Sequence, residues 1–187
     1  METKMSYFAV AGKANTDPTL ALVRERCVEL GIRQVIVAST HGYTALRAAE
    51  VLDGLDVEII AVSICAAFDD VGWTMSREER ARLEAAGITV LTSLHALGDD
   101  VGQAFGGAPA NRVVREVLYC FCQGMKVAVE VALMAADAGL LDISKEVLAV
   151  AGTGEGADTA LVLKPAYARK FKELEVREIL AKPRNAR

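Results

Sequence analysis

Two patterns of apolar and polar positions alternate along this chain. Short apolar runs rich in valine and isoleucine are typical of strands buried on both faces of a sheet, and longer segments with apolar positions every three or four residues are typical of amphipathic helices. Their alternation predicts an α/β fold with a mostly parallel sheet and helices on both of its faces. The expected strands are residues 7–10, 35–38, 57–62, 88–91, 147–151, 159–163 and 176–180. The expected helices are residues 17–30, 42–52, 77–86, 113–123 and 126–138.

Glycines and short connections refine this arrangement. Gly31 and Gly87 each follow an expected helix, at the position where glycine commonly ends one. Gly124 separates the last two helices, and a glycine-rich stretch at residues 102–107 precedes them. Strands 147–151 and 159–163 are close enough in sequence to form a hairpin. We find no repeat, linker or domain boundary, so residues 1–187 are expected to form a single α/β domain.

Composition and charge argue against several classes of partner. The 187 residues are 52% hydrophobic and carry a net charge of -4 with both signs mixed, which predicts a compact core and offers no positive field to a nucleic acid. No basic amphipathic segment suits a membrane surface, and the apolar stretch 127–141 is too short to cross a bilayer. The N-terminal residues do not resemble a secretory signal, so we expect a cytoplasmic protein. Its four cysteines are best interpreted as buried apolar residues rather than as metal ligands.

Small and hydroxylated residues follow five of the expected strands. In an open parallel sheet, ligands bind beyond the carboxyl ends of the strands, where such residues allow close backbone approach and supply neutral hydrogen-bond donors. This favours a crevice for a phosphorylated ligand, although turns also select these residue types for their own sake. The candidate binding residues are Asn15, Thr16, Ser39, Thr40, His41, Gly42, Tyr43, Thr44, Ser63, Gly152, Thr153, Gly154, Gly156, Asp158 and Thr159.

The segment 35–45 is the strongest single indication of a phosphate site. A strand runs through a hydroxyl-rich turn into a helix, and the free N–H groups and dipole of a helix N-terminus favour an anion. Gly42 would let the chain come close to the ligand, Ser39 and Thr44 would add hydroxyl donors, and no lysine is required. The alternative is that Ser39 or Thr40 only caps the helix.

A second glycine-rich segment, residues 152–158, differs from the dinucleotide-binding fingerprint. Its third glycine comes too early, and it leads into an expected strand instead of a helix, so a nicotinamide site is not predicted. Two interpretations remain open. It could be a mobile loop that lines the crevice, with Asp158 accepting a hydrogen bond from a ligand hydroxyl, or a plain hairpin turn.

The expected helix 126–138 is apolar in nearly every direction. Lys126, Glu130 and Asp137 fall within a narrow stripe, which we interpret as a solvent-facing stripe with an i, i+4 ion pair. The alternatives are that the stripe faces the crevice or a subunit partner. So apolar a helix predicts a homo-oligomer, unless helix 113–123 covers it within one subunit.

The turn Ser39-x-His41-Gly42-Tyr43-Thr44-Ala45 is similar to the effector phosphate loop of the pyruvate kinase C-terminal domain, with His41 and Tyr43 in place of a hydroxyl residue and an arginine. The chain is too short to contain the catalytic barrel of that enzyme. It resembles more closely the stand-alone prokaryotic proteins called pyruvate kinase C-terminal-domain-like, over nearly its whole length. The resemblance is carried by residues 15–16, 39–45, 124–130, 134–137, 156–160 and 183–185.

This resemblance implies a three-layer α/β/α fold that binds flavin mononucleotide (FMN), with the phosphate at residues 39–44. The function is then that of a flavin-binding protein, with a flavin-dependent oxidoreductase as one form of it. The alternative is a non-catalytic effector sensor that binds a sugar phosphate or a nucleotide. A hydrolase or transferase using His41 or His95 is not favoured, because no triad, carboxylate pair or metal spacing accompanies either histidine.

Overall fold

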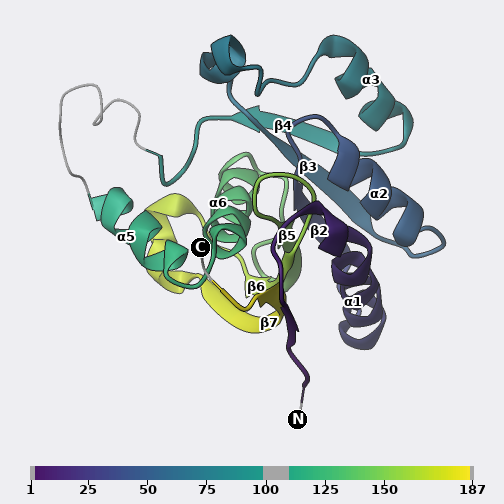
Figure 1. Ribbon diagram of the computed structural model, residues 1–187, viewed down its shortest axis with the longest axis vertical. Coiled ribbons are helices and arrows are strands. Elements are labelled where there is room, and N and C mark those ends of the chain that lie inside the picture. The colour runs from purple at the N-terminus through teal and green to yellow at the C-terminus, as the bar shows by residue number, and fades with distance from the viewer. Residues whose placement is uncertain (1–2, 99–109, 186–187) are drawn as a thin grey trace.

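The computed structural model describes residues 3–98 and 110–185, and its strands form one seven-stranded sheet (Figure 1). The order across the sheet is β1-β7-β6-β5-β2-β3-β4. Neighbouring strands are parallel except at β6, which runs antiparallel to both β5 and β7. The strands are β1 (Ser6–Phe8), β2 (Gln34–Ala38), β3 (Glu58–Ile64), β4 (Thr89–Ser93), β5 (Val147–Ala151), β6 (Thr159–Lys164) and β7 (Glu175–Pro183).

Helices pack on both faces of the sheet, and Figure 1 shows α1, α2 and α3 on one side and α5 and α6 on the other. The helices are α1 (Thr16–Leu30), α2 (Tyr43–Val51), α3 (Arg77–Ala85), α5 (Ala110–Tyr119) and α6 (Gln123–Asp137). Short 3-10 helices lie at η1 (Lys13–Asn15), η2 (Ala66–Val71) and η3 (Ala168–Glu173). Among the described residues, none of the helices has both the length and the apolar character that crossing a membrane requires.

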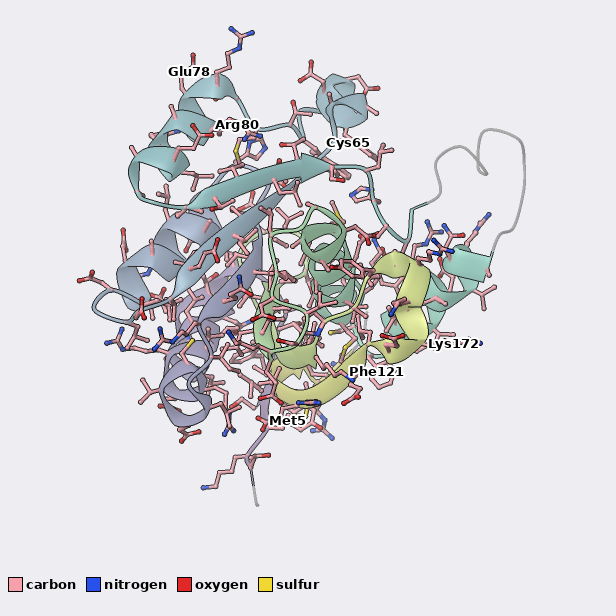
Figure 2. The ribbon with its side chains drawn as sticks, turned by 180° about the vertical axis from the view of Figure 1, so that it is seen from behind. Met5, Cys65, Glu78, Arg80, Phe121 and Lys172 are labelled. Atoms are coloured by element: carbon pink, nitrogen blue, oxygen red, sulfur yellow. The ribbon has the colours of Figure 1, made fainter. Side chains whose placement is uncertain are left out.

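The alternation of side chains along the strands builds two separate cores, one on each face. On β2, Val35 and Val37 pack with α1, α2 and α3, while Ile36 between them packs with α6. All five residues of β5 are buried, as expected of a central strand covered on both faces. Figure 2 shows the molecule from behind, with side chains filling the space between the sheet and its helices.

The predicted α/β class, with a mostly parallel sheet flanked by helices, is confirmed. The predicted hairpin is confirmed as well, because Ala151 pairs with Thr159 in the antiparallel register of β5 and β6. Three predicted helix boundaries were wrong by three residues or more: α5 begins at Ala110 and ends at Tyr119, and α6 begins at Gln123, with Gly124 inside it. Cys122, expected in the earlier helix, instead caps α6, and its Sγ accepts from the N–H of Met125 at 3.3 Å. The glycine-rich stretch 102–107 lies outside the described residues.

The interpretation of Lys126, Glu130 and Asp137 as a solvent-facing stripe is wrong for the first two. Lys126 and Glu130 are buried and form an ion pair, and the N–H of Leu97, in the segment after β4, donates to Glu130. Asp137 is exposed, and its carboxylate accepts from the N–H of Ala168 at the start of η3.

The argument for a homo-oligomer changes because α6 is buried within a single chain, between the sheet and α5. Exposed apolar side chains lie instead on α5, where Val113 and Val117 are 61% and 55% exposed. The homo-oligomer stays a prediction, now assigned to this outer face of α5. Light scattering over a tenfold dilution series tests it, and the mass of a single chain throughout the series would contradict it.

Candidate functional site

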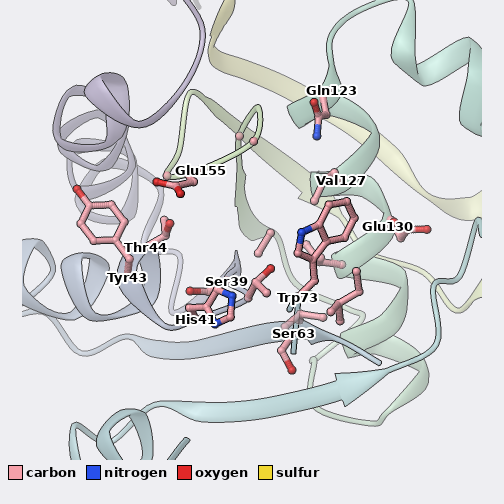
Figure 3. A pocket seen from close by; sticks show the side chains of 18 of the residues that line it. Ser39, His41, Tyr43, Thr44, Ser63, Trp73, Gln123, Val127, Glu130 and Glu155 are labelled. Carbon is pink, nitrogen blue, oxygen red and sulfur yellow. The ribbon is translucent and has the colours of Figure 1, made fainter. Parts of the chain in front are cut away.

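A pocket of about 500 Å³ opens at the carboxyl ends of β2, β3 and β5, with α6 as its opposite wall (Figure 3). Its volume lies within the range typical of sites for small ligands. The pocket lies beyond the carboxyl ends of parallel strands, where the sequence predicted a ligand site. The candidate residues that line it are Ser39, Thr40, His41, Tyr43, Thr44, Ser63, Gly152, Gly154 and Gly156.

The N-terminus of α2 faces this pocket. Gly42 precedes the helix with φ 89°, a left-handed conformation that glycine adopts without strain, and Tyr43 and Thr44 begin the first turn. The first N–H groups of an α-helix have no carbonyl partner within the helix, which leaves them available to an anion. Ser39 is buried and its Oγ accepts from the N–H of Ala45 at 3.4 Å, so its side chain supports the turn, but the N-cap of α2 is Gly42 and neither Ser39 nor Thr40 occupies that position.

Gly42 serves the turn and does not line the pocket. A Cβ at this position would lie 3.4 Å from the side chain of Leu83 in α3. That distance is an ordinary van der Waals contact, so the left-handed φ of Gly42, and not a lack of space, favours glycine here. The close approach of a ligand at Gly42 stays a prediction. The neighbouring residues Thr40, His41 and Tyr43 provide the surface that borders the pocket.

Lys13 brings a positive charge close to the N-terminus of α2. It follows β1, and its Nζ lies 4.3 Å from the centre of the Tyr43 ring and 3.2 Å from Oε2 of Glu155. Both Lys13 and Glu155 line the pocket, and Figure 3 shows Glu155 on the same side as Tyr43 and Thr44. The sequence-based candidates did not include Lys13, because a helix N-terminus binds anions without a lysine; its position directly after a strand was the available signal.

Six of the candidate residues do not line the pocket. One is Gly42, and the other five form hydrogen bonds within and between the loops after β1 and β5. The buried carboxylate of Asp158 accepts from the N–H of Gly12 at 2.8 Å, the N–H of Thr153 at 3.2 Å and the hydroxyl of Thr159 at 2.8 Å. The Thr16 hydroxyl accepts from the N–H of Ala157 at 3.0 Å. The five are Asn15, Thr16, Thr153, Asp158 and Thr159.

Both oxygens of Asp158 accept hydrogen bonds from the protein itself, which favours a structural role over the alternative of a bond to a ligand hydroxyl. Asn15 likewise donates to the carbonyl oxygens of Val10 and Gly12. These bonds hold the loop after β1 against the loop after β5. The close packing extends to Gly156, where a Cβ would lie 2.6 Å from the Cα of Lys13. The result is a fixed position for Lys13 at the rim of the pocket.

Apolar side chains that sequence reasoning missed form much of the remaining wall. They come from the end of β3, from α6 and from the segment after η2, which contributes Trp73. Trp73 is 55% exposed and stacks on Phe68 with ring centres 6.1 Å apart. Nothing in the sequence pointed to Trp73. For α6 there was an indication, because one alternative for its polar stripe was that it faces the crevice. The main apolar residues are Val62, Ile64, Trp73, Val127, Val131 and Met134.

His41 links the pocket to α3. Its Nε2 lies 3.2 Å from the carbonyl oxygen of Gly72, and its Nδ1 lies 3.3 Å from Oε1 of Glu79. Glu79 also completes a capping box with Ser76, and the hydrogen bond from the Ser76 N–H, together with His41, lowers the pKa of the Glu79 carboxyl. These contacts hold the turn before α2 beside the segment that carries Trp73.

The arrangement combines the N-terminus of α2 and Lys13 on one side with a wall opposite that is largely apolar but also contains Gln123, Lys126 and Glu130. Within residues 3–98 and 110–185, no group of three or more His, Cys, Asp or Glu side chains is placed to hold a metal ion. Ser63 and Thr92 bond each other through their hydroxyls at 2.6 Å. A comparison of the sequence with models of known protein families finds no match.

Proposed function

We propose that this protein binds a phosphorylated ligand in the pocket, and that FMN is the ligand that the pocket suits best. The observation that carries the proposal is the N-terminus of α2, which faces a pocket whose other walls are largely apolar. The proposal includes the resemblance to pyruvate kinase C-terminal-domain-like proteins, which implies a three-layer fold and FMN as the ligand.

The residues present fit such a ligand at both of its ends. The N–H groups of Tyr43 and Thr44, the Thr40 hydroxyl and the Lys13 ammonium would hold the phosphate. Trp73 and the apolar side chains of α6 would contact the ring system, which supplies hydride or electron transfer when bound. Apolar walls favour a flavin over a sugar phosphate, whose hydroxyl groups need polar partners.

Titration of FMN and riboflavin against the protein tests this proposal. Riboflavin has the same ring but no phosphate, so it lacks the charge-assisted hydrogen bonds at α2, each worth about 1.5–3 kcal/mol. We expect FMN to bind at least about tenfold more tightly, as measured by quenching of flavin fluorescence. Equal affinities would contradict the phosphate site. A sugar phosphate that displaces FMN at equal concentration would favour the effector sensor.

Glu155 is expected to compete with the phosphate for Lys13, because its carboxylate lies 3.2 Å from Nζ. Both side chains are substantially exposed, so their ion pair is weak and the change will be modest. Glu155→Gln should tighten FMN binding about two- to fivefold and leave riboflavin binding unchanged. Glu173→Gln removes a similarly exposed partner of Lys170 away from the pocket and serves as the control. Weaker FMN binding by Glu155→Gln would show that Glu155 assists the site.

A further inference from the structure

The wall of the pocket opposite α2 contains a buried ion pair. Lys126 and Glu130 lie one turn apart on α6 and both border the pocket, yet their side chains are only 8% and 3% exposed. Burying such a pair costs desolvation energy that the mutual attraction seldom offsets, and apolar side chains would serve the packing of α6 as well. Stability therefore does not account for two charges at this position.

Glu130 links Lys126 to another segment of the chain, because each of its oxygens accepts from a different donor. Its Oε1 accepts from the N–H of Leu97 at 2.9 Å, which ties the carboxylate to the segment after β4, and its Oε2 accepts from Nζ of Lys126. Figure 3 shows Glu130 on α6, across the pocket from Tyr43 and Thr44, with its carboxylate directed away from the middle of the pocket. Lys126, which borders the pocket, is thereby held by Glu130 on the α6 side, away from Tyr43 and Thr44.

The ammonium group has more hydrogen-bonding capacity than the protein uses. A lysine Nζ carries three N–H donors, and one of them meets Glu130. The Tyr119 ring lies 5.8 Å from Nζ, and among residues 3–98 and 110–185 no second hydrogen-bond acceptor reaches it. A fixed cation with spare donors at the edge of a cavity is suited to an acceptor oxygen of a ligand.

We propose that Lys126 forms a second subsite, which binds an acceptor oxygen on the ring end of the ligand, with Glu130 as its positioning residue. The ligand class is a planar heterocycle that carries carbonyl groups at the end remote from its phosphate. This rests on the proposed function, because the phosphate held at α2 determines which end of the ligand faces α6. The pocket then recognises both ends of one molecule and contacts the middle through apolar side chains.

The double variant Lys126→Met/Glu130→Gln tests the subsite without leaving a single buried charge. The introduced glutamine would retain an acceptor oxygen for the N–H of Leu97. We expect the affinities for FMN and riboflavin to fall by the same factor, about 10- to 100-fold, because both contain the ring. Thr40→Val at the other end should weaken FMN alone. Lys170→Met/Glu173→Gln, which neutralises an exposed pair, should change neither affinity.

Three outcomes separate this inference from the proposed function. Unchanged flavin affinities in a folded double variant would overturn the subsite and leave the proposed function standing. A loss confined to FMN would also overturn it, since Lys126 would then serve the phosphate. A wild-type protein that binds no flavin would overturn both.

Lys126→Arg provides a second test if the double variant does not fold, which circular dichroism would show. It keeps the charge but changes the geometry of the donors. We expect it to shift the visible absorption maximum of bound FMN while leaving the ratio of FMN to riboflavin affinities unchanged. An unshifted spectrum would overturn the subsite.

Discussion

Replacing Asp158 with alanine is expected to lower the free energy of unfolding by about 3–5 kcal/mol. The side chain is fully buried, and its oxygens accept hydrogen bonds from two backbone N–H groups and from the Thr159 hydroxyl. Alanine would leave all three donors without this acceptor, and buried donors to a charged group are costly to leave unsatisfied. Urea denaturation measures the change. Because the bond to Gly12 also holds the loop that carries Lys13, the variant should bind FMN more weakly than the wild type.

Two further variants sharpen this expectation. Asp158→Asn retains one acceptor oxygen but presents an NH₂ group to the donors, so its loss of stability should be intermediate. Asp56→Ala removes an exposed carboxylate that pairs with Arg33, and its effect should stay below about 1 kcal/mol. Similar unfolding free energies for the two alanine variants would contradict the role assigned to Asp158.

The second large effect is expected at Gly124, where alanine should destabilise the protein by about 3 kcal/mol. A Cβ there would lie 2.1 Å from Oγ1 and 2.5 Å from Cβ of Thr159, so α6 would have to move away from β6. Helix propensity alone predicts the opposite sign, a gain of about 1 kcal/mol when alanine replaces glycine within a helix. The sign of the measured change therefore decides between close packing and propensity.

Gln123→Ala is the matched control, because Gln123 is the exposed neighbour in the same first turn of α6. It should change the unfolding free energy by less than about 0.5 kcal/mol. If Gly124→Ala proved as stable as this control, the close contact between α6 and Thr159 would not be the reason for glycine at position 124.

Two segments show where sequence reasoning succeeded and where it failed. The strand at 147–151 was predicted with its observed boundaries, because a continuous apolar run ends at a glycine and needs no knowledge of the rest of the fold. Gly124 was interpreted as the break between two helices, yet it lies inside α6. The glycine is needed there because of a contact with Thr159, which lies on another element and leaves no trace in local periodicity.

The candidate site divides in the same way. Strand order places the ends of β2, β3 and β5 at one edge, so the pocket could be located from residues such as Ser39, Ser63 and Gly152. Polarity alone could not tell that Asp158 bonds a loop near the start of the chain. Trp73 and the α6 residues were missed because tertiary packing, not strand order, brings them to the pocket.

The pairing of β1 with β7 has a consequence for folding during synthesis on the ribosome. β1 lies at the edge of the sheet, and its register with β7 places Ser6 opposite Ala181, near the other end of the sequence. Strands β2 to β5 can pair during translation, whereas β1 must wait until β7 has been synthesised. The loop that carries Lys13 docks on residues 156–158, which precede β7, so only the edge strand itself waits for the end of the sequence. The sheet is therefore closed at this edge only when synthesis has reached the final strand.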